Sequence, residues 1–154
     1  MNKEWRVLGI RDLELILSFE RDGLNSTGRS EIERMMDEWN SSWRKESLEH
    51  YLAMGWSMAA WVRNANGEEL AGYFLAQPFL FFQGKTQVLW VELLRANSDE
   101  VRAELVDIAY KLSREKHLQS VLFNSQEDLA EILEKYKRAP LTNPIFEVMT
   151  TKRG

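Results

Sequence analysis

The sequence of 154 residues contains no cysteine, no excess of positive charge and no long hydrophobic run. The absence of cysteine excludes disulfides, catalytic thiols and Cys-ligated zinc, and it fits a reducing compartment. The longest apolar stretch, around 79–82, is too short to cross a bilayer, and no apolar signal sequence follows the first charged residues. We therefore expect a cytoplasmic protein that has no membrane partner.

The charge balance argues against nucleic acid as a partner. Lys and Arg number 20 against 24 Asp and Glu, which gives a formal net charge of −4. Non-specific nucleic-acid binding needs a basic face that displaces counterions. With 44% hydrophobic residues, a chain of this length can form one domain over residues 1–154 and bury its core without a metal or a disulfide.

Several common site motifs are also missing. Gly84-Lys85-Thr86 resembles the end of a phosphate-binding loop, but the first glycine of that motif would fall on Phe79. No Gly-x-Ser-x-Gly or Gly-x-Gly-x-x-Gly segment is present. His50 and His117 lie far apart in the sequence, each without an obvious ligand partner, so we expect no metal site.

Hydrophobic periodicity predicts alternating helices and strands. Ser30 is a good N-cap for the second helix, Gly55 is a good helix stop, and Asn66-Gly67 favours a hairpin turn. The predicted helices are a first one opened by Arg11-Asp12 and ended by Gly23, a second over 31–43 that continues or restarts through 52, a third over 101–112 and a fourth over 127–136. The predicted strands cover 5–8, 56–63, 70–82, 88–94, 120–123 and 145–150.

The element order is therefore β-α-α-β-β-β-α-β-α-β, an α/β fold with a mixed, mostly antiparallel sheet flanked by helices. In order and length it resembles the GNAT (Gcn5-related N-acetyltransferase) superfamily over nearly the whole chain. The resemblance implies acetyl transfer from acetyl-coenzyme A to an amine of a small molecule or peptide. It also implies that the fourth strand and the start of the next helix hold the cofactor.

The segment at that place departs from the family pattern, Arg/Gln-x-x-Gly-x-Gly/Ala. Leu94 to Arg102 contains no glycine, Asn97 or Ser98 is an ordinary N-cap, and Asp99 and Glu100 follow in the first turn. Two carboxylates near a pyrophosphate cost on the order of 1 kcal/mol per pair. The positions that the resemblance assigns to the cofactor are Leu93, Leu94, Arg95, Asn97, Ser98, Val101, Arg102 and Asn124.

Two residues are candidates for catalysis. Glu92 lies in an apolar strand where the family often carries a general base, although it could instead pair with an arginine or point outward at the end of the strand. Tyr136 lies one turn beyond Leu133, the position where the family often places a tyrosine that acts as general acid. Tyr136 could be this general acid moved by one turn, or an ordinary surface tyrosine.

Two apolar features remain. Met35, Met36, Trp39 and Trp43 form a stripe that predicts packing of the second helix on the sheet, with an acceptor pocket as the alternative. The apolar strands 70–82 and 88–94 exceed the needs of one small core, which favours a homodimer.

The sequence leaves two functions open. The first is an N-acetyltransferase with Glu92 as base, Tyr136 as acid and an altered pyrophosphate site. The second is a GNAT-like domain that has lost acetyl-coenzyme A binding and acts as an interaction or regulatory module.

Overall fold

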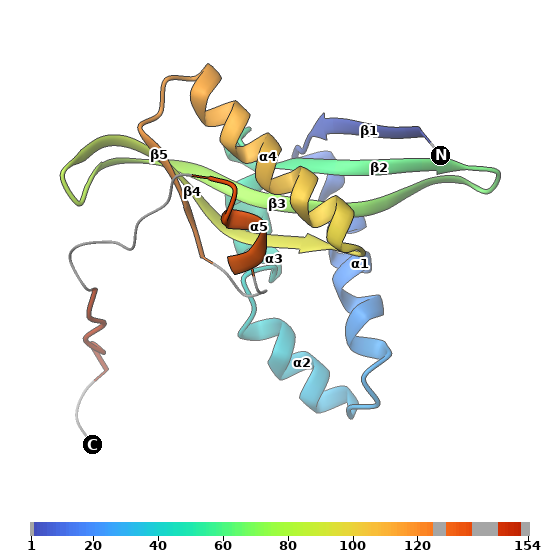
Figure 1. Cartoon of the computed structure of the whole chain (residues 1–154). Coiled ribbons are helices and arrows are strands. Elements are labelled where there is room, and N and C mark those ends of the chain that lie inside the picture. Colours follow the sequence, from blue (N-terminus) through green and yellow to red (C-terminus); the bar gives the residue numbers. More distant parts are fainter. Residues whose placement is uncertain (1, 125–128, 137–144, 152–154) are drawn as a thin grey trace.

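The computed structural model describes residues 2–124, 129–136 and 145–151. Its described part forms a five-stranded sheet in the order β1-β2-β3-β4-β5 (Figure 1). Neighbouring strands are antiparallel except β4 and β5, which are parallel. The strands are β1 (Asn2–Val7), β2 (Met58–Asn64), β3 (Gly67–Phe82), β4 (Lys85–Ala96) and β5 (Ser120–Phe123).

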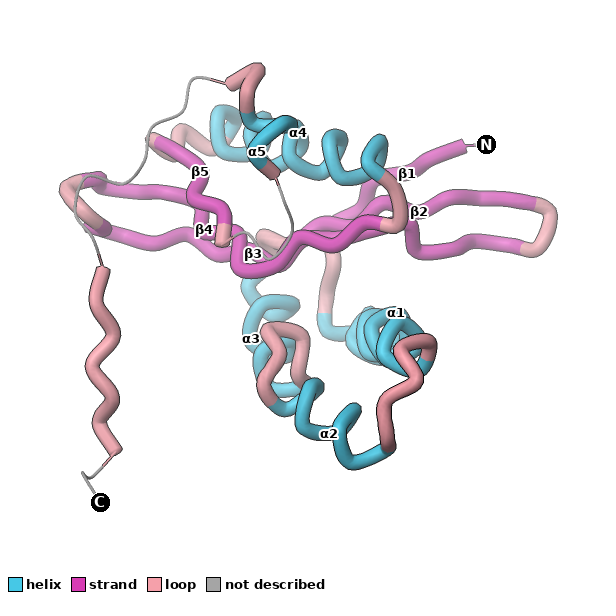
Figure 2. Tube along the Cα trace, turned by 60° about the horizontal axis from the view of Figure 1, so that its bottom comes forward, coloured by secondary structure: helices cyan, strands magenta, loops and turns pink. Residues whose placement is uncertain are grey.

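Helices cover both faces of this sheet (Figure 2). One face carries α4 and α5, and the other carries α1, α2 and α3. The mixed α/β architecture expected from the sequence is thereby confirmed. The helices are η1 (Ile10–Asp12), α1 (Leu13–Asn25), α2 (Glu31–Trp39), α3 (Lys45–Met54), α4 (Asp99–Glu115) and α5 (Ala130–Leu133).

Two apolar clusters hold these layers together. Leu89 and Val91 of β4 pack with Leu105 of α4 on one face, and Leu93 packs with Leu48 of α3 on the other. All five side chains are buried. Each such side chain contributes roughly 1.5–3 kcal/mol through its removal from water, so β4 is stabilised from both sides.

Local signals place several element ends as expected. The hydroxyl of Ser30 accepts a 3.2 Å hydrogen bond from the amide of Glu33, whose carboxylate accepts one from the amide of Ser30. Gly55 ends α3 in the left-handed conformation with φ 79°. Of the two alternatives for the second helix, the structure shows the restart, because α2 ends at Trp39 and α3 begins at Lys45.

Three expectations of the sequence analysis are wrong. Gly23 does not end α1, which continues to Asn25, because its φ is not positive and no close approach requires a glycine there. Residues 145–150 form no strand; they lie away from the sheet with their side chains exposed (Figure 1). Of the predicted stripe, Trp43 is buried, whereas Met35, Met36 and Trp39 of α2 are exposed.

The apolar strands also give a different result from the one expected. Most of the apolar side chains of β3 and β4 are buried within one copy, and Leu80 and Phe81 at the hairpin tip are the strongly exposed ones. The apolar content of these strands therefore serves the monomer core and gives no reason for a second copy.

Candidate functional site

Within the described residues β5 pairs with β4 only part of the way along β4, and we call the point where this pairing ends the separation of the two strands. They pair from Val88 with Ser120 to Val91 with Phe123, and the amide of Asn124 then donates a 2.9 Å hydrogen bond to the carbonyl of Val91. Beyond this point β4 continues to Ala96 paired with β3. A bulge lies at the separation, since Leu75 pairs with Leu93 and Ala76 pairs with Val91. Glu92 is the extra residue of this bulge.

The bulge turns the Glu92 carboxylate toward the helices α2 and α3. It accepts a 2.7 Å hydrogen bond from the indole N–H of Trp90 and a 3.2 Å hydrogen bond from the hydroxyl of Ser42. Ser42 lies in the segment between α2 and α3. Of the alternatives for Glu92, pairing with an arginine is therefore not what the structure shows.

Tyr51 of α3 is a further neighbour of the Glu92 carboxylate. Burial, followed by the charge of Glu92, raises the pKa of Tyr51 to about 12. The phenol is therefore protonated at neutral pH and can donate a hydrogen bond to the carboxylate. The ring of His50 lies beside that of Tyr51, with the two ring centroids 5.0 Å apart. His50 also forms a 2.9 Å hydrogen bond with Gln77.

We call this group the Glu92 cluster; its members are Ser42, His50, Tyr51, Gln77, Trp90 and Glu92. Of these residues the sequence indicated only Glu92, because a carboxylate within an apolar strand is unusual. Trp90 lies two residues before Glu92 on β4, and the other members come from α3, β3 and the segment after α2, with no short motif that joins them.

Tyr136 lies on the opposite face of the sheet from the Glu92 cluster. Its hydroxyl donates a 2.9 Å hydrogen bond to the carboxylate of Asp107 on α4, and its ring lies 5.0 Å from that of Tyr110. Burial, followed by Asp107, raises the pKa of Tyr136 to about 12. Because α4 and α5 lie across the sheet from α2 and α3 (Figure 2), Tyr136 and Glu92 do not share one surface.

The residues expected at the cofactor divide into buried and polar groups. Leu93 and Leu94 face opposite sides of the sheet and are buried, and Val101 is buried against β3. Asn124 lies at the separation of the strands, where its side-chain amide donates a 3.2 Å hydrogen bond to the carbonyl of Glu92. Asn97 donates its backbone amide to the carbonyl of Ala71 at 2.9 Å.

Arg95 contacts α1, on the face of the sheet that α1, α2 and α3 cover. Its Nε lies 3.4 Å from the carboxylate of Glu20 on α1, which is buried and also accepts a 2.7 Å hydrogen bond from the hydroxyl of Tyr73. A buried carboxylate requires such partners, because an unpaired buried charge is strongly destabilising. Arg95 therefore has a structural partner that competes with any phosphate.

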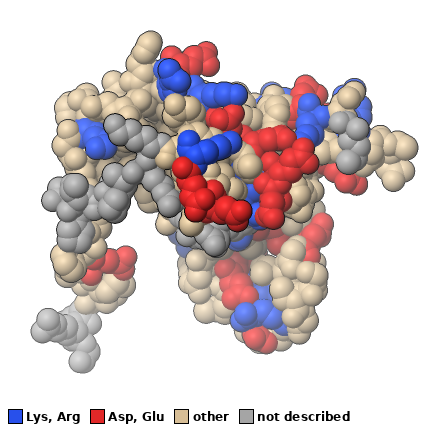
Figure 3. All heavy atoms as spheres, in the orientation of Figure 1, with Lys and Arg blue, Asp and Glu red and all other residues tan. Residues whose placement is uncertain are grey.

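The N-terminus of α4 is satisfied by the protein itself. The hydroxyl of Ser98 accepts a 3.2 Å hydrogen bond from the amide of Val101, Arg102 forms an ion pair with Asp99, and Glu100 lies 2.8 Å from Lys3 of β1. Figure 3 shows acidic side chains gathered over this end of α4. A pyrophosphate fits these residues poorly, since two carboxylates oppose it and one carboxylate already holds Arg102.

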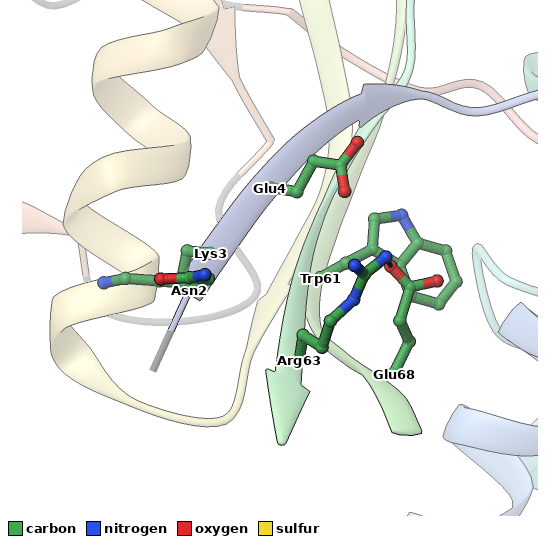
Figure 4. A pocket seen from close by; sticks show the side chains of 6 residues that line it. All are labelled: Asn2, Lys3, Glu4, Trp61, Arg63 and Glu68. Atoms are coloured by element: carbon green, nitrogen blue, oxygen red, sulfur yellow. Dashed lines mark hydrogen bonds and ion pairs between the residues drawn. The ribbon is translucent and has the colours of Figure 1, made fainter. Parts of the chain in front are cut away.

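A separate cavity of about 350 Å³ lies at the outer edge of the sheet (Figure 4). It is lined by Asn2, Lys3, Glu4, Trp61, Arg63 and Glu68. Its charged groups have protein partners: Arg63 lies 3.4 Å from Glu68, and Lys3 pairs with Glu100 and Glu104. We assign no chemistry to it.

Two further site types are missing from the described part of the chain. Within residues 2–124, 129–136 and 145–151, no three His, Asp or Glu side chains form a group suited to a metal ion. In the same residues, no helix is both long and apolar enough to cross a membrane.

Comparison with known proteins gives structural matches only. No protein-family model matches the sequence, and no curated protein is significantly similar to it. Among solved structures, a GCN5-related N-acetyltransferase from Ralstonia eutropha JMP134 is 14% identical, covers 96% of this chain and 99% of its own, and has a TM-score of 0.64.

Two further structures agree with this match. A predicted acetyltransferase from Clostridium acetobutylicum, solved with acetyl-CoA, is 12% identical, with 96% of both chains covered and a TM-score of 0.64. A putative acetyl transferase from Pyrococcus furiosus is 17% identical, with 96% of this chain and 99% of that one covered and a TM-score of 0.61. The chain therefore has the fold of the GNAT acetyltransferases, over nearly its whole length.

Proposed function

We propose that this chain transfers an acetyl group from acetyl-coenzyme A to an amine of a small molecule or a peptide. The observation that carries the proposal is the separation of β4 from β5 beside the bulged Glu92. Among the residues that the structure describes, none pairs with the β5 side of β4 as a strand beyond Val91, next to the Glu92 carboxylate, within a fold shared with acetyltransferase structures. One of those structures was solved with acetyl-CoA.

In this proposal Glu92 accepts the proton that the acceptor amine loses. Its carboxylate is held in place by Trp90 and Ser42, so it is positioned before the acceptor binds. When the amine attacks the acyl carbon, the bond from that carbon to sulfur breaks and coenzyme A leaves as a thiolate, and we expect Tyr136 to give this thiolate its proton. The phenol holds that proton at neutral pH, since its pKa is raised to about 12, and it lies on the α4 face, across the sheet from Glu92.

Bound acetyl-coenzyme A supplies an activated acyl carbon. The residues proposed to hold it are those at the end of β4, the start of α4 and the end of β5: Leu93, Leu94, Arg95, Asn97, Ser98, Val101, Arg102 and Asn124. Because the α4 N-terminus fits the pyrophosphate poorly, we expect weak cofactor binding.

The second candidate function is a non-catalytic interaction or regulatory module. The observation that favours it is the α4 N-terminus, where Ser98 caps the helix and Asp99 and Glu100 pair with Arg102 and Lys3. The helix dipole favours an anion at the N-terminus of α4, but the protein's own carboxylates already occupy this place.

Calorimetry and thermal shift with coenzyme A and acetyl-coenzyme A separate the two functions. A ligand at about a hundred times its dissociation constant adds roughly 2.7 kcal/mol of stability. We expect this shift to fall in Arg95→Ala and Arg102→Ala but to remain in Arg11→Ala, a matched control whose exposed side chain lies on η1. No shift at millimolar cofactor would overturn the acetyltransferase proposal in favour of the module.

Two further variants sharpen the test. Asp99→Asn and Glu100→Gln each remove one charge that opposes a pyrophosphate, so cofactor binding should tighten by about fivefold or more. Glu92→Gln should keep cofactor binding and lower turnover by roughly 10²–10⁴-fold, the usual contribution of a general base. Unchanged turnover in this variant would remove Glu92 from the mechanism.

A further inference from the structure

The apolar side chains of α2 face solvent. Ile32 is 74% exposed, Met35 62%, Met36 55% and Trp39 61%. Their spacing of three, four and seven residues places them on one side of the helix. We call these four residues the α2 stripe.

The opposite, charged side of α2 faces the rest of the protein. Glu38 lies 2.7 Å from Arg21 of α1, and Asp37 lies 3.0 Å from Arg29 in the segment before the helix. Arg34 donates a 2.8 Å hydrogen bond to the carbonyl of Arg29. Arg34, Asp37 and Glu38 are the half-buried residues of this helix.

This orientation is the reverse of the usual one for a surface helix, which buries its apolar side. The ion pairs to Arg21 and Arg29 fix it, so the stripe cannot be turned inward without breaking them. An exposed contiguous apolar surface of this kind marks an interaction site.

We propose that the α2 stripe is the contact between two copies of this chain, with the two α2 helices antiparallel. The charges at the two ends of the stripe support this arrangement. Glu31 and Glu33 lie at its beginning, where Glu33 also lies 3.5 Å from Arg29 of its own chain, and Arg44 and Lys45 follow its end. An antiparallel pair places the acids of one copy beside the bases of the other at both ends, although Arg44 also lies 3.7 Å from Glu46 of its own chain.

The antiparallel contact forms a closed dimer. In a two-fold contact the same patch serves both partners, so one stripe satisfies the other and no third copy is recruited. Arg44 also stacks its guanidinium 4.9 Å from the ring centroid of Trp39, which holds a positive charge at the edge of the stripe. The two-fold axis would pass near Met35 and Met36, in the middle of the stripe.

Other occupants fit these residues less well. A membrane surface with anionic lipids attracts helices rich in Lys and Arg, whereas α2 begins with Glu31 and Glu33 and the chain carries a net charge of −4. A nine-residue helix covers less than the roughly 800 Å² per partner of a standard interface, so the dimer should be weak and dependent on concentration.

Sedimentation equilibrium over micromolar to sub-millimolar protein tests the proposal. The wild type should pass from monomer to dimer, and Met35→Glu should weaken dimerisation by at least about tenfold. Ile145→Glu is the matched control, because Ile145 is 66% exposed and lies outside the stripe. A wild type that stays monomeric, or an equal effect of both variants, would overturn the proposal.

The absence of cysteine allows a second measurement of geometry. Met35→Cys, oxidised gently, should form a disulfide-linked dimer in high yield, whereas Leu15→Cys on the exposed side of α1 should not. An equimolar mixture of Ile32→Cys and Trp39→Cys should form the mixed dimer in preference to either homodimer. Preferred homodimers would show a parallel contact and contradict the antiparallel arrangement.

A vesicle control completes the design. Binding of the wild type to vesicles that contain anionic lipid, lost in Met35→Glu, would assign the stripe to a lipid surface and overturn the proposal. Circular dichroism of each variant should remain that of the wild type, because the substituted side chains are exposed. None of these measurements depends on acetyl-coenzyme A, so they stand apart from the test of the proposed function.

Discussion

The indole N–H of Trp90 donates a 2.7 Å hydrogen bond to the carboxylate of Glu92, two residues later on the same strand. The two side chains share one face of β4, and Trp90 is itself stacked on Phe79 with ring centroids 5.4 Å apart. The position of the Glu92 carboxylate thus depends on an aromatic pair farther along the sheet.

Trp90→Phe should destabilise the protein, since a hydrogen bond to a charged group contributes about 1.5–3 kcal/mol. Phenylalanine keeps a ring for stacking on Phe79 and removes the donor. Urea unfolding of Trp90→Phe, Glu92→Ala and the double variant measures the coupling, which we expect to be about 1 kcal/mol or more. Strictly additive effects would show that the two side chains do not stabilise each other.

Gly72→Ala should be strongly destabilising. A Cβ at this position would lie 2.6 Å from the carbonyl oxygen of Arg95 and 3.0 Å from side-chain atoms of Leu105 and Val101. Relief requires β3 to move away from the end of β4 and the start of α4, so we expect a loss of about 2 kcal/mol or more in the free energy of unfolding. Chemical denaturation gives the value, and a neutral result would contradict this close packing.

Gly23→Ala should have the opposite effect. Gly23 lies inside α1, and a Cβ there would meet nothing within 4 Å. Alanine has a higher helix propensity than glycine, which predicts a gain of about 0.5–1 kcal/mol in the free energy of unfolding. A lowered melting temperature in this variant would indicate that α1 does not continue past Gly23.

Tyr51 should make the folded state sensitive to alkaline pH. Its pKa is raised from 10.0 to about 12, first by burial and then by Glu92. Because the folded value exceeds the unfolded one, the resulting stability is fully present below pH 10 and is lost as the pH rises toward about 12. The difference in absorbance at the phenolate band between wild type and Tyr51→Phe should titrate near the upper value, and a midpoint near 10 would contradict the burial of this phenol.

Local chemistry in the sequence determined much of the framework. The capping box of Ser30 and Glu33, the stop at Gly55 and the N-cap at Ser98 involve residues within one turn of each other. The alternating and continuous apolar patterns likewise predicted the strands of the sheet. In a half-buried strand every second side chain points into the core, so apolar residues recur every two positions. Element order then followed, and with it the resemblance to a known fold.

The tertiary structure decided the features that depend on distant partners. Arg21 and Arg29 hold the charged side of α2 inward, so a stripe that predicted core packing faces solvent. The bulge at Glu92 places its carboxylate beside Ser42, fifty positions earlier in the chain, and Tyr136 lies on the other face of the sheet. Periodicity gives the faces of an element but not the identity of what each face meets, because that choice is made by contacts between residues far apart in the sequence.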